Sequence, residues 1–268
     1  MNLKNHKIID LSVPIEANEN EPFGVKHNFL DHSNGAKQFS KLVNKKYDLK
    51  NNDKWDEHVF PDNEFLARDI ITMSCHTGTH IDAPYHYGSK CEGKPSKTVD
   101  ELPLEWFINE GVKLDFSNLT EPYSITKEMV KQEILTKELE INNNTVVLIE
   151  TGYSNFWGFP EYKNINISIE LDALDYILNK GVKVIGIDTF GFDISFPEMI
   201  QKYNETKNTS YLWPTHFYGR KREYIQIERM NNLHLLPSKN FIFNGAPLKI
   251  INGEASWIRA NAILNMED

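Results

Sequence analysis

Two short, largely apolar segments constrain the fold of this chain more than any other feature. Residues 145–150 and 182–187 consist mainly of valine, isoleucine and leucine, and the second segment is followed directly by Asp188. A strand without polar alternation is buried on both faces, as in the centre of a parallel sheet covered by helices. Residues 171–179 lie between these segments and are predicted to form a helix that ends at Gly181. Because strands alternate with helices, the chain is predicted to have an α/β fold.

The remaining predicted elements fit a single domain that spans residues 1–268. Thr126 is the predicted N-cap of a helix over residues 126–140. The other predicted strands are 7–15, 70–74, 111–116, 224–228 and 240–243. The region from about residue 16 to 66 is polar and has little periodicity, so it is predicted to be an excursion or a lid instead of a second core.

The composition excludes several classes of partner. A net charge of −9 argues against binding to nucleic acid, because phosphate-backbone binding needs a concentrated basic face. No apolar run approaches the roughly 20 residues that span a bilayer, and the first residues do not resemble a signal peptide. The two cysteines cannot form a disulfide framework. We therefore expect a cytoplasmic protein that has no membrane partner and acts on a small molecule.

A cluster of metal-ligand residue types follows the predicted strand over residues 70–74. Four such residues lie within eleven positions: His76, His80, Asp82 and His86. Imidazole and carboxylate are suitable ligands for Zn²⁺, Mn²⁺ or Fe²⁺. A helix that carries His76 and His80 is disfavoured by Gly78 between them and by Pro84 after them. A tight turn at Gly78 is predicted instead, followed by an extended stretch in which His80 and Asp82 point the same way.

The alternative is a set of unrelated histidines that pack in a loop or bond to the backbone. A lone pair of histidines four residues apart would favour that interpretation. Four metal-type residues around a glycine and before a proline favour a metal site, because the ligand types and the turn chemistry agree.

The segment from His76 to His86 resembles the HxGTHxDxPxH signature of the cyclase family, which includes bacterial kynurenine formamidase and isatin hydrolase. Similar segments recur along the chain at residues 9–12, 149–152, 186–188 and 247–250, and near Arg259. The resemblance implies a swivelling β/β/α fold, hydrolysis of an amide or lactam bond, and a homodimer or homotetramer. It also implies site roles: a metal ion held by His76, His80 and Asp82, and a proton shuttle at His86.

The same resemblance implies a second ion. In the kynurenine formamidase branch, the shared aspartate binds it together with a later histidine and glutamate, which His216 and Glu228 match here. Without the resemblance, His216 is only a weak candidate for a metal ligand, because a single histidine beside aromatic residues is more often packed in the core than bound to a metal ion. We therefore expect one or two divalent ions per chain, zinc or manganese.

Other polar and aromatic residues follow the buried strands. Asp188 and Asp193 lie where ligands commonly bind in α/β folds, although Asp188 suits a turn acceptor equally well. Tyr153 and Trp157 follow residues 145–150 and are predicted to contact substrate, although aromatic residues are more often core.

Three functions remain open on the sequence. The leading prediction is a metal-dependent hydrolase of a small amide, lactam or ester, similar to an arylformamidase. The second is a biosynthetic, polyketide-type cyclase or dehydratase that uses the ion to polarise a carbonyl. The third is a non-catalytic protein with a structural metal, which is disfavoured because structural zinc sites are usually closed by four ligands rich in cysteine.

Overall fold

The computed structural model describes residues 5–17, 21, 23–120, 122–164 and 167–265. The chain divides into two compact units. The larger unit comprises Met1–Ile15 together with Cys75–Asp268, and the smaller unit comprises Glu16–Ser74.

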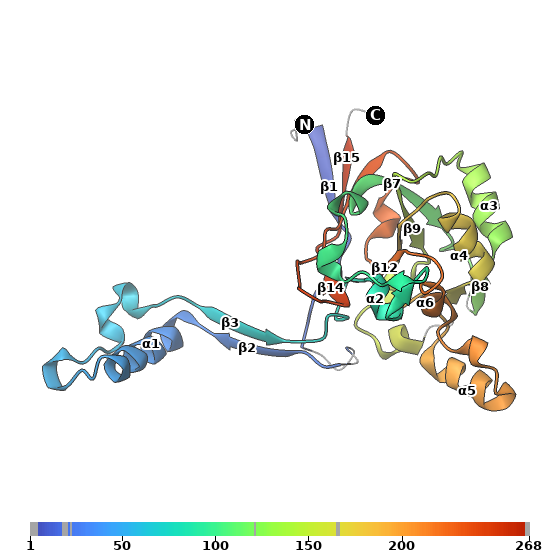
Figure 1. The fold of residues 1–268 in the computed structure, drawn as a ribbon. Helices are drawn as coiled ribbons and strands as arrows, with labels where there is room; N and C mark the ends of the chain where they lie inside the picture. Colours follow the sequence, from blue (N-terminus) through green and yellow to red (C-terminus); the bar gives the residue numbers. More distant parts are fainter. Residues whose placement is uncertain (1–4, 18–20, 22, 121, 165–166, 266–268) are drawn as a thin grey trace. The chain divides into compact units, whose positions relative to one another are not determined.

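The larger unit is built on a mixed sheet (Figure 1). Among the described residues this sheet has nine strands, in the order β1 (His6–Asp10), β15 (Asn261–Asn265), β13 (Phe241–Asn244), β7 (Ile108–Asp115), β9 (Thr145–Glu150), β11 (Val184–Ile187), β12 (Ile225–Glu228), β4 (His80–Asp82) and β14 (Ala255–Trp257). The four strands from β7 to β12 are parallel, and the flanking pairs are antiparallel. The predicted α/β class is confirmed.

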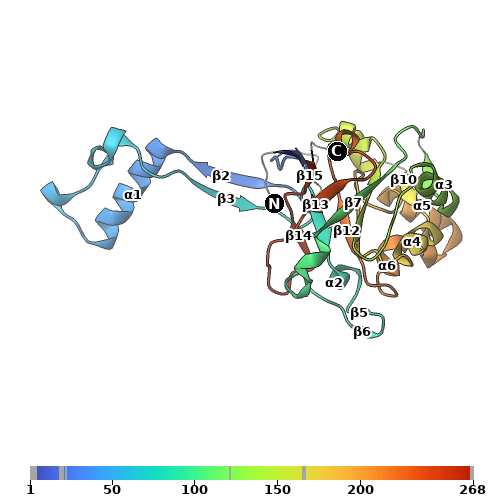
Figure 2. The same ribbon diagram turned by 90° about the horizontal axis from the view of Figure 1, so that it is seen from above.

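Strand β9 shows how the sheet separates two apolar cores. All its residues are buried, as its sequence predicts. Val147 and Ile149 join the core beneath α3 (Lys127–Thr136) and α4 (Leu171–Leu178), two helices that lie side by side (Figures 1 and 2). Val146 and Leu148 point to the opposite face and join the second core.

The sheet curls around the second core. Ser12, two residues beyond the edge strand β1, pairs with Met230, two residues beyond β12. In the strand order, β1 and β12 are six steps apart, which in a flat sheet is about 29 Å at ~4.8 Å per step. Val13 N also donates a hydrogen bond of 2.9 Å to Thr79 Oγ1, next to β4. The two ends of the sheet therefore approach each other, and β4 lies where they meet.

Short elements complete the larger unit. They are the parallel pair β8 (Tyr123–Ile125) and β10 (Ile167–Ile169), the hairpin β5 (Lys90–Cys91) and β6 (Lys94–Pro95), the helices α2 (Pro84–Tyr87), α5 (Phe196–Thr206) and α6 (Pro214–Tyr218), and the 3-10 turns η5 (Val99–Glu101), η6 (Leu104–Trp106), η7 (Tyr153–Phe156), η8 (Pro160–Asn164), η9 (Thr209–Tyr211) and η10 (Leu233–Leu235). No helix among the described residues is long and apolar enough to cross a membrane.

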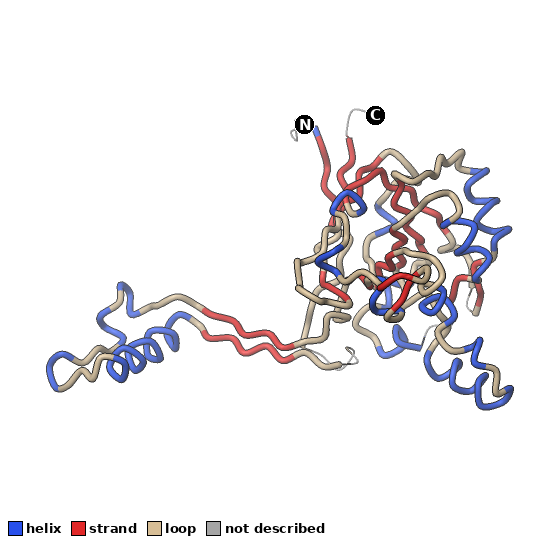
Figure 3. The backbone as a smooth tube through the Cα atoms, viewed as in Figure 1, coloured by secondary structure: helices blue, strands red, loops and turns tan. Residues whose placement is uncertain are grey.

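The smaller unit has more regular structure than its polar sequence indicates. An antiparallel ribbon of β2 (Lys26–Leu30) and β3 (Arg68–Thr72) leads to the helix α1 (His32–Lys46) (Figure 3). The turns η2 (Asn51–Asp53), η3 (Glu57–Val59) and η4 (Pro61–Asn63) follow. The rings of Phe39, Phe60 and Phe65 pack together, with Phe39 and Phe65 stacked at 4.3 Å between ring centroids. The prediction of an excursion with little periodicity missed the helix and β2. The strand predicted over residues 70–74 corresponds to β3, which begins and ends two residues earlier.

Several predicted boundaries are also corrected. The strand predicted over residues 7–15 ends at Asp10, because the chain then leaves β15 to bond at the other end of the sheet. The predicted helix over 126–140 begins after Thr126, whose Oγ1 accepts a hydrogen bond from Met129 N, and it ends earlier, at Thr136.

Candidate metal centre

Strand β4 fixes the direction of the first ligand-type side chains. His80 and Asp82 are its first and third residues, so their side chains lie on one face, as predicted. Glu228 of β12 stands opposite His80 in the antiparallel register, which puts its side chain on the same face. All three side chains are buried.

The turn before β4 orients the ring of His80. Gly78 has a φ of +61°, so the predicted turn at this glycine is confirmed and no helix joins His76 to His80. The carbonyl oxygen of Gly78 accepts a hydrogen bond of 2.8 Å from His80 Nδ1, which leaves Nε2 without a proton in the neutral ring. Burial lowers the pKa of His80 to about 3, so that the ring is neutral at pH 7 and offers a lone pair at Nε2.

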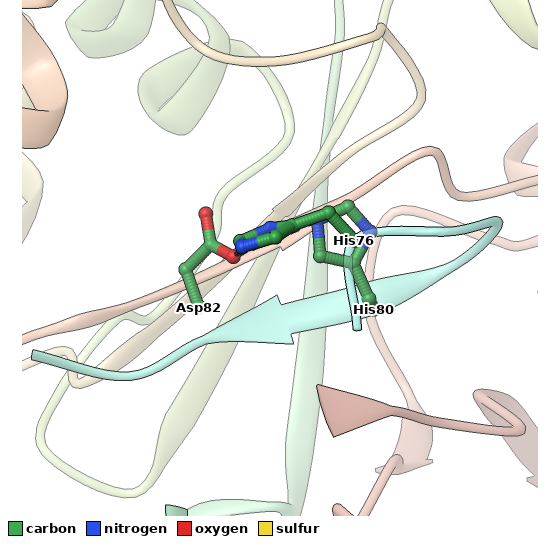
Figure 4. A group of neighbouring side chains, drawn as sticks. All are labelled: His76, His80 and Asp82. Atoms are coloured by element: carbon green, nitrogen blue, oxygen red, sulfur yellow. Dashed lines mark ion pairs between the residues drawn. The ribbon is translucent and has the colours of Figure 1, made fainter. Parts of the chain in front are cut away.

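His76, His80 and Asp82 converge on one point (Figure 4). The Oδ1 atom of Asp82 lies 3.0 Å from His76 Nδ1 and 3.5 Å from His80 Nε2. One ligand atom from each of the three side chains lies within 4.8 Å of the other two. Two imidazole nitrogens and one carboxylate oxygen are a donor set suited to a divalent transition metal.

Several atoms of this face have no hydrogen-bond partner although they are buried. Among the described residues, His80 Nε2, Asp82 Oδ2 and Glu228 Oε1 are in this state. A buried polar atom without a partner costs about 1–3 kcal/mol, so orphaned atoms grouped together indicate a missing ligand. The residues therefore fit a bound cation.

His86 approaches the same carboxylate from outside the sheet. Pro84 occupies the first position of α2, where a proline is tolerated, so it begins a one-turn helix instead of preventing one. This turn places His86 Nε2 4.0 Å from Asp82 Oδ2. With 30% of its side chain exposed, His86 is more open to solvent than the other histidines of the cluster.

His216 and Glu228 join the cluster from α6 and β12, as the resemblance implies. His216 Nε2 lies 3.7 Å from Asp82 Oδ2 and 3.6 Å from Glu228 Oε1. Its Nδ1 lies 2.7 Å from Asp193 Oδ2, and this contact orients the ring. The sequence flagged Asp193 only as a polar residue near the end of a buried strand.

The electrostatics of the cluster also favour a cation. Burial, followed by the charge of Asp82, raises the pKa of Glu228 to about 7. Burial acts to raise the pKa of Asp82 as well, but the hydrogen bond from His76 and the charges of nearby histidines outweigh it and lower that pKa. Two carboxylates that share a buried pocket repel each other, and a divalent ion offsets this repulsion.

Glu254 is the cluster member that the sequence did not reveal. It immediately precedes β14, and its carboxylate contacts both His76 and His86. Burial acts to raise the pKa of Glu254, but the hydrogen bonds from these two histidines outweigh it and lower the pKa to about 2. An isolated acid 168 residues from His86 has no spacing signal, because only the pairing of β14 with β4 brings it near.

The aromatic residues predicted to contact substrate lie in a neighbouring cluster. Tyr153, Trp157 and Phe190 pack against the buried pair Tyr162 and Ile167. The ring of Phe190 lies 4.1 Å from the guanidinium carbon of Arg229, the residue after Glu228. Phe190 thus links this aromatic cluster to the residue that follows Glu228, a contact that the sequence did not predict.

Asp188 has a structural role in holding the chain after β9. Its carboxylate accepts hydrogen bonds from Thr151 N, Thr151 Oγ1 and Gly152 N at 2.7–2.9 Å. Burial raises its pKa to about 6. Of the two interpretations left open by the sequence, the geometry matches the turn acceptor.

Comparisons with known proteins show the family and the fold of the chain. A family model described as "Putative cyclase" matches residues 9–194. The chain is 29% identical over 201 residues to an uncharacterized protein of Methanocaldococcus jannaschii, covering 75% of this chain and 84% of that protein. It is 29% identical over 191 residues to kynurenine formamidase of Geobacillus thermodenitrificans, covering 71% and 77% respectively. Isatin hydrolase A of Labrenzia aggregata has a similar fold, with a TM-score of 0.73, 21% identity, and coverage of 97% of this chain and 94% of that one.

Proposed function

The chain belongs to the cyclase family, and from this premise we propose that it is a divalent-metal-dependent hydrolase of a carbon–nitrogen bond in a small, non-peptide amide or lactam. Kynurenine formamidase is similar in sequence, and isatin hydrolase is similar in fold. The first name refers to a formamide and the second to a lactam, and both bonds are attacked by water at a carbonyl carbon.

One observation carries the proposal. The buried ligand atoms His80 Nε2, Asp82 Oδ2 and Glu228 Oε1 belong to one cluster of side chains and lack hydrogen-bond partners among the described residues. A packed protein core does not retain such a group without a ligand, since each orphaned atom lowers stability. The partly exposed ring of His86 beside this cluster makes the site open, whereas a structural zinc site is closed by four protein ligands.

The residues divide into two sets of metal ligands that share Asp82. His76, His80 and Asp82 would hold one ion, and Asp82 with His216 and Glu228 would hold a second. Nitrogen and oxygen donors of this kind suit zinc or manganese. When bound, a divalent ion lowers the pKa of a water molecule and polarises a carbonyl oxygen.

His86 is the residue placed to move protons. Its Nε2 faces Asp82, while its Nδ1 contacts Glu254 at 2.7 Å. A histidine held this way takes a proton from the attacking water and returns it to the leaving nitrogen, which is general base and then general acid catalysis. Its exposure lets it reach a substrate that enters from solvent.

The aromatic cluster supports an aryl substrate. Phe190 packs against the same buried residues as Tyr153 and Trp157 and also contacts Arg229, the residue after Glu228. We propose this aromatic cluster as a surface for a flat ring. An aryl formamide or a lactam fused to an aromatic ring combines such a ring with a cleavable carbonyl group.

Product mass tests the function. The protein is stripped of metal, reloaded with Zn²⁺ or Mn²⁺, and incubated with N-formylkynurenine or with isatin. Metal-dependent formation of products whose combined mass exceeds that of the substrate by one water supports the hydrolase; for N-formylkynurenine, these products are an amine and formate. A product that has lost water or kept its mass would instead identify a cyclase or dehydratase, and no reaction of either compound in the metal-loaded protein would reject both substrates.

A further inference from the structure

The backbone of Glu254 is fixed beside the metal-type residues. Its carbonyl oxygen accepts a hydrogen bond of 2.9 Å from Ala83 N, and the next residue, Ala255, pairs with Asp82 in the sheet. Ala83 lies between Asp82 and the helix that carries His86. The backbone of Glu254 is therefore held beside Asp82 and Ala83, in the segment that carries the ligand-type side chains.

The carboxylate of Glu254 bridges two histidines that have different predicted tasks. Its Oε1 and Oε2 atoms lie 3.1 and 2.9 Å from His76 Nε2, and Oε2 also lies 2.7 Å from His86 Nδ1. An ionised carboxylate only accepts hydrogen bonds, so both imidazole nitrogens that face it must carry protons.

A histidine that binds a metal ion must be neutral, and in a neutral ring these contacts determine which nitrogen carries no proton. In His76, a proton on Nε2 leaves the lone pair on Nδ1, the atom that lies 3.0 Å from Asp82 Oδ1. In His86, a proton on Nδ1 leaves Nε2 free, and Nε2 is the atom that faces Asp82 Oδ2. One carboxylate thus directs a metal-binding lone pair on one ring and a proton-accepting lone pair on the other.

We propose that Glu254 is a positioning residue that couples metal binding at His76 to proton transfer at His86, by holding both rings in the required tautomer and orientation. This role rests on the proposed function, since it assigns those tasks to the two histidines. A carboxylate behind a metal-ligating histidine raises the basicity of that ligand, and its loss typically weakens metal affinity or activity about 10–100-fold.

Two variants separate this role from simple packing. Glu254→Ala removes both acceptors. Glu254→Gln keeps the size of the side chain and can offer one oxygen to both rings, since Oε2 alone contacts both, but it loses the charge and places an NH₂ group beside His76. Glu223→Ala is the matched control, because Glu223 is another partly buried glutamate held in ion pairs, with Lys97 and Lys183.

The Zn²⁺ dissociation constant is measured for each variant by competition with a chromogenic chelator, and kcat and KM are measured at saturating metal. For Glu254→Ala we expect a dissociation constant about 10–100-fold weaker. We also expect a kcat about 100-fold lower with KM nearly unchanged, because the ring of His86 acts in proton transfer and not in substrate binding. Glu254→Gln falls between Glu254→Ala and the wild type, and Glu223→Ala matches the wild type.

Two results would overturn the proposal. Metal affinity and kcat within twofold of wild type in Glu254→Ala would show that Glu254 positions neither ring. Loss of one whole equivalent of bound metal in that variant would make Glu254 a metal ligand. The affinity measurement needs no substrate. If the hydrolase proposal fails, the effect of Glu254 on metal binding by His76 can therefore still be tested.

Discussion

Asp82 is the carboxylate on which four histidines converge. Its two oxygens lie 3.0 Å from His76, 3.5 Å from His80, 3.7 Å from His216 and 4.0 Å from His86. A buried carboxylate is unfavourable unless cations or hydrogen bonds compensate its charge. The contacts with several histidines, together with the orphaned Oδ2, make Asp82 the ligand common to both proposed ion sites.

Substitution of a single residue, His86, is expected to reduce turnover strongly while leaving metal binding largely intact. His86→Ala removes the proton carrier but none of the three proposed ligands of the first ion, so most of the metal stays bound while kcat falls about 10²–10⁴-fold. Bound metal is measured by elemental analysis after dialysis, with the exposed His234→Ala as the control. Equal loss of metal in His86→Ala and Asp82→Ala would make His86 a ligand.

His76 and His216, two of the proposed metal ligands, are also sites where a proton would compete with the ion. Burial acts to lower the pKa of both rings, but contacts with Asp82 and Glu254 raise that of His76 to about 10, and contacts with Asp193 raise that of His216 to about 9. In the metal-free protein these raised pKa values stabilise the fold below pH 6.5, and this contribution is lost as the pH rises towards 9–10.

The metal-loaded protein is expected to show the opposite trend. Each proton displaced by the ion makes the apparent metal affinity rise about tenfold per pH unit. The increase in melting temperature on addition of Zn²⁺ therefore grows between pH 6 and 8.5, and calorimetry in buffers of different ionisation enthalpy detects the released protons. A metal-induced increase that is constant over this range would contradict the assignment of His76 and His216 as ligands.

At the scale of elements, local spacing and sheet register contribute differently to the site. The extended spacing of His80 and Asp82 and the turn at Gly78 follow from rules that act within a few residues, so the sequence predicts them. Glu228 and Glu254 enter from β12 and β14, the two strands that flank β4, and one chain contains no spacing that reveals this pairing. The family resemblance predicted Glu228 as a site residue, whereas nothing in the sequence predicted Glu254.

The same distinction explains which strands were predicted well. Strand β9 is buried on both faces, so its composition alone marks its limits at Thr145 and Glu150. Strand β1 ends at Asp10 although the apolar pattern continues, because the following residues bond to the far end of the sheet. In the smaller unit, α1 buries only Gly35, Ala36, Ser40 and Val43, which is too narrow an apolar stripe to give a strong periodic signal.

Gly78 offers a test of the turn that carries His76. A Cβ atom there would lie 3.2 Å from Ile15 Cγ1, and the residue has a positive φ. Gly78→Ala is expected to cost roughly 1–2 kcal/mol in backbone strain and to weaken metal affinity, because the turn must shift. Gly93→Ala is the matched control, since Gly93 also has a positive φ but its Cβ would meet open space.

Chemical denaturation and metal titration of both variants give the comparison. Both variants lose stability, but only Gly78→Ala loses metal affinity. If Gly78→Ala bound metal as tightly as Gly93→Ala, the position of His76 would not depend on this turn.

At the scale of the whole molecule, the smaller unit exposes much apolar surface. Among its described residues, the exposed large hydrophobic side chains are Phe23, Phe29, Leu42, Tyr47, Trp55, Val59, Leu66, Ile70 and Ile71. Exposed apolar side chains in this number are available for burial in an interface. They favour the homodimer or homotetramer expected from the family resemblance, which stays a prediction.

Light scattering coupled to size exclusion measures this directly. We expect a mass that is two or four times the 31.1 kDa of one chain. Replacing Ile70 and Ile71 of β3 by threonine, which keeps the β-branched shape, is expected to shift the protein towards the monomer. A wild-type protein that is monomeric at micromolar concentration would contradict the prediction.

The central claim is that the cluster around Asp82 is a divalent-metal centre. Its most direct test is the stoichiometry of Zn²⁺ and Mn²⁺ bound by the stripped wild-type protein and by Asp82→Ala, measured by isothermal titration and elemental analysis, with folding checked by circular dichroism. We expect one or two ions per chain in the wild type and none retained by the folded variant. Equal binding by the two proteins would contradict the claim, because the shared ligand of both proposed sites would then be dispensable.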